Sequence, residues 1–310
     1  MEGTTEKFRE CAAAEHRLFS KKLEELIEKR FAKNKKKKAQ KAFERLLMSE
    51  LWMSHCLFFD GIELLDTLID DECLAEAEEL DRNFSGNIRS LLPDRIRENR
   101  CFQNSLSKLL AFSSKGVGKC ELLLPLLIKG WKNEDSKDGS LRGKAVEIKS
   151  FSGGSMKPAR STKNGHIDEL NDRLFGGHPP MNSKKGHEKH LAALEGIDAR
   201  EAYLEYFSKI LDKSKAEVER LADDLIENIS DIEACRNIYG RHVLKAYREI
   251  DGFGIIMLID PESGDMASIA DFDDIPEEIA FSPKMTRRGD TQALADRYVN
   301  IKANKKKRRR

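Results

Sequence analysis

Proline is nearly absent from the N-terminal part of this chain, where Pro93 stands alone among residues 1–112. Proline breaks helix interiors because it lacks an N–H donor and its ring clashes with the preceding turn. In the same region apolar residues recur three and four positions apart, the spacing of an amphipathic helix. These stripes are Phe19, Leu23, Leu26 and Ile27, then Phe43, Leu46, Leu47 and Leu51, then an acidic stretch over 62–80. Residues 1–112 are therefore expected to form a helical N-terminal region.

Beyond residue 113 the composition predicts a mixed α/β domain. Eleven of the 20 glycines and four of the eight prolines fall between Gly116 and His190. The periodicity and the flanking turn residues predict elements in this order: a helix at 121–127, a strand at 145–150, helices at 201–211 and 216–229, and strands at 254–259 and 266–270. We expect a core over residues 113–285 with a long basic loop at 151–186, followed by a basic tail at 286–310.

The charges are strongly segregated, although the formal net charge is only +1. Residues 21–45 hold eleven Lys or Arg against four acids, and residues 60–84 hold ten acids against one arginine. Residues 296–310 hold eight basic side chains against one acid. Basic blocks of this kind suit polyanions, although each block alone is also compatible with a solvated helix face or a frayed terminus. The basic and acidic stretches of the N-terminal region are expected to pack side by side.

Composition also excludes several classes of protein. No apolar run approaches the roughly eighteen residues that a membrane span needs, which argues against an integral membrane protein. The first residues lack the apolar segment of a secretory signal. The six cysteines are scattered without a CxxC pair. This pattern favours reduced thiols in a cytoplasmic protein over disulfides or a zinc site.

The segment around Asp138 carries the most informative charges. Side chains alternate between the two faces of a strand, so Glu147 and Lys149 would share one face of the strand expected at 145–150. A turn at Arg142-Gly143 would bring Asp138 back beside Glu147. Two carboxylates with open coordination positions suit a hard cation such as Mg²⁺, and an adjacent ammonium can stabilise charge on a phosphodiester. An exposed hairpin with an incidental ion pair is the alternative.

These residues resemble a known family. The run Gly116-Val117-Gly118-Lys119-Cys120-Glu121, then Asp138, then Glu147-Ile148-Lys149-Ser150, resembles the PD-(D/E)XK nuclease superfamily, above all its phage-encoded and restriction-like members. The resemblance covers about residues 113–158 and extends weakly to 254–259. It implies an α/β fold with a restriction-endonuclease-like core, in which helices flank a mixed central sheet.

The resemblance also implies roles for four residues. Asp138, Glu147 and Glu121 would be metal ligands, with Glu121 carried by a helix, and Lys149 would act with Asp138 and Glu147 in catalysis. The sequence departs from the family pattern where Gly139 follows the aspartate instead of an aliphatic residue. Pro125 stands four residues after Glu121, so a helix would either start near Glu121 or kink there.

Other patterns support weaker hypotheses. A histidine group is interpreted as part of a basic loop that touches phosphates, because neighbouring lysines would repel a metal ion. It consists of His166, His178, His187 and His190. Gly116-Val117-Gly118-Lys119 lacks the spacing of a phosphate loop, so no nucleotide cofactor is expected, and no GxSxG motif occurs. A surface turn accounts for Asp271, Asp273 and Asp274.

The expected function is that of a Mg²⁺-dependent deoxyribonuclease, with Mn²⁺ as a possible substitute. DNA is the expected partner, and a homodimer formed through the N-terminal region is possible. The lysines and arginine expected to contact phosphates are Lys35, Lys36, Lys37, Lys38, Lys157, Arg160, Lys163, Lys184 and Lys185, together with the terminal basic run. The alternative is a non-catalytic nucleic-acid-binding or assembly protein on a degenerate nuclease fold.

Overall fold

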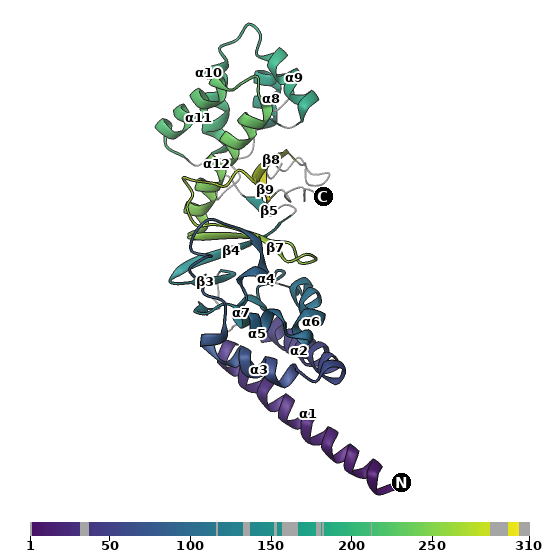
Figure 1. Ribbon diagram of the computed structural model, residues 1–310. Coiled ribbons are helices and arrows are strands. Elements are labelled where there is room, and N and C mark those ends of the chain that lie inside the picture. The colour runs from purple at the N-terminus through teal and green to yellow at the C-terminus, as the bar shows by residue number, and fades with distance from the viewer. Residues whose placement is uncertain are drawn as a thin grey trace, which may run out of the picture. The chain divides into compact units, whose positions relative to one another are not determined.

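The chain folds into two compact units (Figure 1), which a computed structural model reveals. The first unit comprises Met1–Phe151 and Gly254–Ala270, and the second comprises Ser152–Phe253 and Asp271–Arg310. The described residues are 2–31, 37–115, 117–132, 137–151, 154–156, 167–177, 181, 183–211, 213–285 and 297–303. The boundary expected at residue 112 does not separate these units, because the N-terminal helices pack in the same unit as the sheet.

The first unit combines helices from the N-terminal region with one sheet. Its helices are α1 (Glu2–Phe31), α2 (Lys37–Phe58), α3 (Gly61–Ile69), the short 3-10 helix η1 (Asp71–Cys73), α4 (Ile88–Leu91), α5 (Asp94–Arg97), α6 (Arg100–Ala111) and α7 (Leu124–Leu127). Its strands are β1 (Phe84–Asn87), β2 (Trp131–Lys132), β3 (Gly139–Leu141), β4 (Lys144–Ser150), β6 (Ile255–Ile259) and β7 (Asp265–Ile269).

The acidic stretch forms a shorter helix than its apolar pattern predicts. Helix α3 ends at Ile69, and the Asp70 carboxylate then accepts a hydrogen bond from the Glu72 amide to start η1. Aspartate side chains compete in this way with the helical backbone for amide donors. The single long helix expected over 62–80 is therefore wrong beyond residue 69.

The sheet is mixed, with strand order β1-β7-β6-β4-β3-β2. Strand β4 runs parallel to β6, and the other neighbours are antiparallel. Val146, Ile255 and Met257 belong to the buried cluster that also holds the apolar faces of the N-terminal helices, and those helices gather on one side of the sheet (Figure 1). The strands predicted at 145–150, 254–259 and 266–270 are confirmed, as is the α/β class.

Ion pairs join the acidic stretch to several basic side chains. On α1, Lys22 pairs with Asp66, and both Lys29 and Arg30 pair with Asp71. Closer to the sheet, the pairs are Lys129 with Glu72 and Glu76, Arg142 with Glu78, and Lys144 with Asp81. The expectation that the basic and acidic stretches pack side by side is confirmed.

The second unit contains helices and a small antiparallel sheet. Its helices are α8 (Ile167–Phe175), α9 (Lys184–Ala193), α10 (Ala199–Ile210), α11 (Lys215–Glu227) and α12 (Ile232–Asp251). Its strands β5 (Gly154–Met156), β8 (Ile279–Met285) and β9 (Arg297–Ala303) pair in the order β5-β9-β8. Helices α10 and α11 match the prediction. The prediction of a long loop at 151–186 is wrong for the residues that form β5 and α8. The prediction of a tail at 286–310 is wrong for the residues that form β9.

None of the helices in the described part of the chain is both long enough and apolar enough to cross a lipid bilayer.

Arg30 is expected to stabilise the contact between α1 and α3. Its guanidinium, about 10% exposed, donates to the Leu68 carbonyl at 2.7 Å and pairs with Asp71. Arg30→Met should lower the free energy of unfolding by about 1 to 3 kcal/mol, because the Leu68 carbonyl loses a donor and Asp71 loses one of its two cationic partners. Urea denaturation measures the change. Lys22→Met, at a more exposed pair, serves as the control and should cost less than about 1 kcal/mol; equal losses would contradict the role given to Arg30.

Candidate active site on the β3–β4 hairpin

A tight turn joins the two strands that carry the candidate residues. Arg142 and Gly143 both adopt positive φ angles, 50° and 80°, as the central residues of a type I′ hairpin turn do. The register pairs Leu141 with Lys144 and Gly139 with Val146. Asp138 therefore lies beside Glu147, as the sequence predicts.

The backbone of β4 holds the Asp138 side chain. Its Oδ2 accepts a hydrogen bond of 2.7 Å from the Ile148 amide. This bond crosses from the residue before β3 to the middle of β4, so the carboxylate direction depends on the hairpin register. Sequence spacing predicts that Asp138 comes near Glu147, but it gives no sign of this amide donor.

Glu147 and Lys149 lie on one face of β4, as their alternation predicts. Their side chains are about 15% and 19% exposed and form an ion pair. Their parallel partners on β6 are Ile256 and Leu258. The intervening Ile148 instead packs against the apolar cluster that includes the N-terminal helices. The charged side chains Glu147 and Lys149 therefore lie on one face of β4, and Ile148 lies on the opposite face, toward the N-terminal helices.

Glu121 reaches the site from a turn and not from a helix. Helix α7 begins at Leu124 with Pro125 in its first turn, where a missing amide donor costs nothing. Glu121 is 7% exposed, and its carboxylate accepts a hydrogen bond from the Gly118 amide. The expectation that a helix carries Glu121 is wrong, because the helix starts three residues later.

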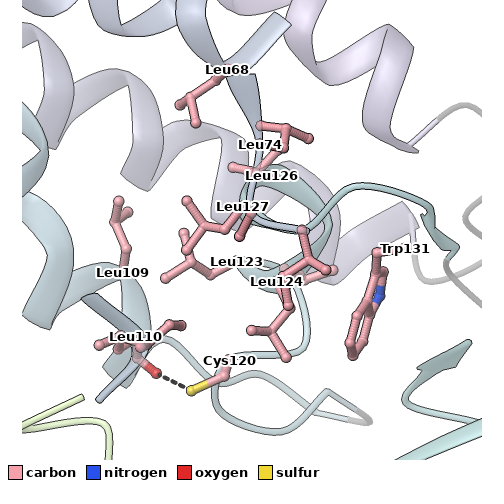
Figure 2. Close-up of a cluster of buried hydrophobic side chains, with 14 of the residues drawn as sticks. Leu68, Leu74, Leu109, Leu110, Cys120, Leu123, Leu124, Leu126, Leu127 and Trp131 are labelled. Carbon is pink, nitrogen blue, oxygen red and sulfur yellow. Dashed lines mark hydrogen bonds between the residues drawn. The ribbon is translucent and has the colours of Figure 1, made fainter. Parts of the chain in front are cut away.

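A cluster of leucines anchors the turn that holds Glu121. Figure 2 shows Leu123 and Leu127 close to Leu109, with the Cys120 thiol directed at the Leu110 carbonyl. That sulfur donates to the carbonyl oxygen at 3.5 Å. The helix predicted at 121–127 is therefore confirmed only over Leu124–Leu127, and the residues before it form a turn that packs against α6.

The carboxylates of the site act on one another electrostatically. Burial, together with the negative charges of Glu121 and Glu147, raises the pKa of Asp138 to about 7, although the Ile148 hydrogen bond and the Lys149 ammonium act in the opposite direction. A carboxylate so perturbed marks a candidate functional site. The other three residues named from the sequence, Glu121, Glu147 and Lys149, therefore all influence the Asp138 carboxyl.

The donor set fits a hard divalent cation in its chemistry. Carboxylate oxygens are the ligands that Mg²⁺ prefers, and no thiol or imidazole takes part in the cluster. Within the described ranges, no three His, Cys, Asp or Glu side chains are arranged to hold one metal ion. In this arrangement the ammonium of Lys149 lies against Glu147 and supplies positive charge.

Trp131 explains why glycine follows the aspartate. A Cβ atom at Gly139 would lie only 2.5 Å from the indole ring of Trp131, which β2 carries. An aliphatic residue, as in the family pattern, would clash with that ring. The departure noted at Gly139 therefore reflects packing between β2 and β3, which the sequence does not reveal.

Four of the nine candidate phosphate-binding residues lie in the described part of the chain, and all four are exposed. Lys37 and Lys38 are exposed in the first turn of α2, and Lys184 and Lys185 are exposed in the first turn of α9. Several of the others lie outside the described residues, namely Lys35, Lys36, Lys157, Arg160 and Lys163. His166, His178 and the terminal run 304–310 also lie outside them.

The interpretation of the remaining histidines as phosphate contacts in a loop is wrong. His187 and His190 lie on α9 and are buried. His187 Nε2 is 2.8 Å from the Ile229 carbonyl oxygen, and His190 Nε2 is 2.8 Å from the Tyr203 hydroxyl. The His190 ring also stacks on Tyr203 and meets Phe175 edge to face. These histidines belong to an aromatic core.

The cysteines and the acidic turn at Asp271 have the structural roles expected of them. All six cysteines are free thiols. Burial raises the pKa of Cys101 and Cys120 to about 12, which keeps both thiols protonated. Asp271 caps a surface turn by accepting from the Asp273 amide at 2.9 Å.

Comparison with protein-family models, curated proteins and solved structures finds no match.

The pKa of Asp138 predicts an unusual dependence of stability on pH. Between the ordinary value of 3.8 and about 7, the folded state binds the proton more tightly than the unfolded chain. This contribution to stability is therefore lost as pH rises through that range, by up to about 4 kcal/mol. Asp138→Asn should remove this loss and be more stable than wild type at pH 8 in EDTA.

Urea denaturation between pH 5 and pH 8 measures this effect. Glu78→Gln is the matched control, because Glu78 is an exposed carboxylate of the same unit that pairs with Arg142. The control should keep the wild-type pH dependence. Identical pH profiles for wild type and Asp138→Asn would contradict the raised pKa.

Proposed function

We propose that this protein is a metal-dependent endonuclease that hydrolyses DNA phosphodiester bonds. One observation carries the proposal: Asp138, Glu147 and Lys149 act on one another at the β3–β4 hairpin, and Glu121 joins them from a separate turn. Carboxylates that are partly or fully buried beside a single ammonium are expensive for a fold to maintain. Hydrolysis of a phosphodiester on a bound cation is a reaction that would use such a cluster.

The order of strands supports the resemblance to PD-(D/E)XK nucleases. Strands β2, β3 and β4 form an antiparallel meander, and the chain then returns so that β6 runs parallel to β4. Helices flank this mixed sheet. A restriction-endonuclease-like core has the same general plan, and we propose that this chain shares it.

In the proposed mechanism, Asp138 and Glu147 would hold Mg²⁺, and the negative charge of Glu121 beside them would add to the attraction for the ion. The ion, when bound, supplies a water of lowered pKa and offsets charge on the phosphate. Lys149 is held beside Glu147 on the same strand face. From there its ammonium would orient the nucleophile and stabilise negative charge that develops on the phosphate oxygens.

Asp138 would also give the reaction a pH dependence. Its pKa of about 7 means that the carboxyl is partly protonated at neutral pH. Only the ionised form can ligate a cation, so divalent-ion affinity should rise with pH until Asp138 is fully charged.

DNA is the proposed substrate because the basic residues suit a phosphate backbone. Lys37, Lys38, Lys184 and Lys185 are exposed, and such contacts give salt-dependent affinity with little base specificity. Homodimerisation, the use of Mn²⁺ and a cytoplasmic location remain predictions.

The alternative proposal is a nucleic-acid-binding or assembly protein without catalysis. The ion pair between Lys149 and Glu147 favours it, since a non-catalytic scaffold would neutralise its buried charge in this way. The two proposals differ in whether a divalent cation enters the site.

Cleavage of supercoiled plasmid and of single-stranded DNA, with Mg²⁺ or EDTA, tests the proposal. Wild type should cut in Mg²⁺ only. Glu147→Gln, Asp138→Asn and Lys149→Met should each lower the rate by about 100-fold or more, because each removes charge stabilisation in the transition state. Glu121→Gln should have a smaller effect.

Glu78→Gln and Lys129→Met are matched controls, since both residues form exposed ion pairs of the same unit. They should retain wild-type rates. Calorimetric titration with Mg²⁺ gives a readout independent of cleavage, and binding should disappear in Glu147→Gln. A wild type that cuts no faster than the Glu147→Gln variant, and takes up no Mg²⁺, would overturn the proposal in favour of the non-catalytic one.

A further inference from the structure

The exposed face of α2 carries cations and no acid. Its exposed residues are Lys37, Lys38, Lys41, Ala42, Arg45, Ser49, Met53, Cys56 and Leu57. The two acidic residues of the helix lie elsewhere: Glu50 is buried and pairs with Lys108 at 2.7 Å, and Glu44 accepts a hydrogen bond from Gln40 at 2.8 Å. One end of the helix thus presents four positive charges to solvent.

These four residues, here named the α2 cation row, differ from the other basic residues around them. The acidic stretch pairs with Lys22, Lys29 and Arg30 on α1 and with basic side chains near the sheet. The row consists of Lys37, Lys38, Lys41 and Arg45, and none of them forms an ion pair with any residue that the structure describes. The acidic stretch leaves this row uncompensated.

The nearest acids only partly balance the row. Glu28 and Glu44 line a cavity of about 280 Å³ together with Lys37 and Lys41. Lys38 and Arg45 do not line that cavity. The row therefore keeps an excess of positive charge, which attracts a polyanion across solvent.

Helical geometry spaces the row in a regular way. Lys37, Lys41 and Arg45 are four residues apart, which places successive side chains about 6 Å apart along the axis. Two nucleotides of one strand of B-DNA rise about 7 Å. Side chains as long as lysine and arginine can adjust to this small difference.

We infer that the α2 cation row binds the phosphate backbone of duplex DNA. The inference rests on the proposed function in taking DNA as the polyanion, and it adds a binding surface away from the β3–β4 hairpin. Its contacts fix no base sequence, because phosphates are the same at every step. The row would raise affinity for any duplex and position the chain along it.

Binding of a fluorescein-labelled duplex of about 20 base pairs, followed by anisotropy in EDTA at about 50 to 200 mM salt, tests the inference. The full chain is used throughout. Exchange of all four cations of the row for glutamine should weaken binding at least about tenfold and lower the slope of log affinity against log salt by about 3 to 4. The variant Lys41→Gln/Arg45→Gln should show about half of that change in slope, and it replaces the quadruple variant if the latter is unfolded by circular dichroism.

The matched control removes four positive charges that already have acidic partners. It combines Lys22→Gln, Lys29→Gln, Lys129→Gln and Arg97→Gln. The net charge changes by the same amount, but the slope should change by less than about 1. Equal slopes for the row variant and wild type would overturn the inference.

Three further outcomes separate the inference from its alternatives. In the first outcome, wild type binds vesicles of anionic phospholipid and the row variant does not, while neither shows salt-dependent binding to DNA. That result would assign the row to a membrane surface and overturn the inference. Plasmid cleavage by wild type with unchanged DNA affinity in the row variant would contradict the inference and leave the proposed nuclease standing. Row-dependent DNA binding without Mg²⁺-dependent cleavage would support the inference and contradict the nuclease.

Discussion

The geometry of the candidate site depends on the two-residue turn at Arg142 and Gly143. Both residues adopt positive φ, and the turn sets the register in which Gly139 faces Val146. With this register the Ile148 amide reaches the Asp138 carboxylate. A slip by one residue would turn Glu147 and Lys149 toward the apolar core, because side chains alternate along a strand. Charge and core therefore stay on opposite faces of β4 only while this turn is kept.

Charge is the second organising feature, and it acts mostly within the chain. The acidic stretch forms ion pairs with α1 and with basic residues near the sheet. Exposed pairs of this kind contribute little stability each, but together they decide which cations remain available to a partner. The near-zero net charge of the whole chain conceals this division. Asp138, Glu147 and Glu121 form a separate group of carboxylates, with Lys149 as their positive neighbour.

Much of the first unit was predictable because its signals are local. Alternation along residues 145–150, the apolar run at 254–259 and the turn pair at 142–143 each depend on the conformation of a few adjacent residues. Glu121 shows the limit: its apolar neighbours look helical, but the helix begins only at Leu124, and Glu121 lies in the turn before it. The buried His187 and His190 show the same limit, since their lysine neighbours suggested a basic loop. Strand β9 was missed because its pairing with β8 and β5 joins segments far apart in the chain, and it stands in a tail that is rich in basic residues.

By itself the sequence determined the α/β class, the hairpin, and the face of β4 that carries Glu147 and Lys149, because periodicity and turn chemistry act over short distances. Only the tertiary structure decided which charges stay unpaired, how Glu121 comes to the site, why Gly139 must lack a side chain beside Trp131, and that burial raises the pKa of Asp138. These properties depend on contacts between segments far apart in the chain. Desolvation and packing at such contacts cannot be read from the residues of either segment alone.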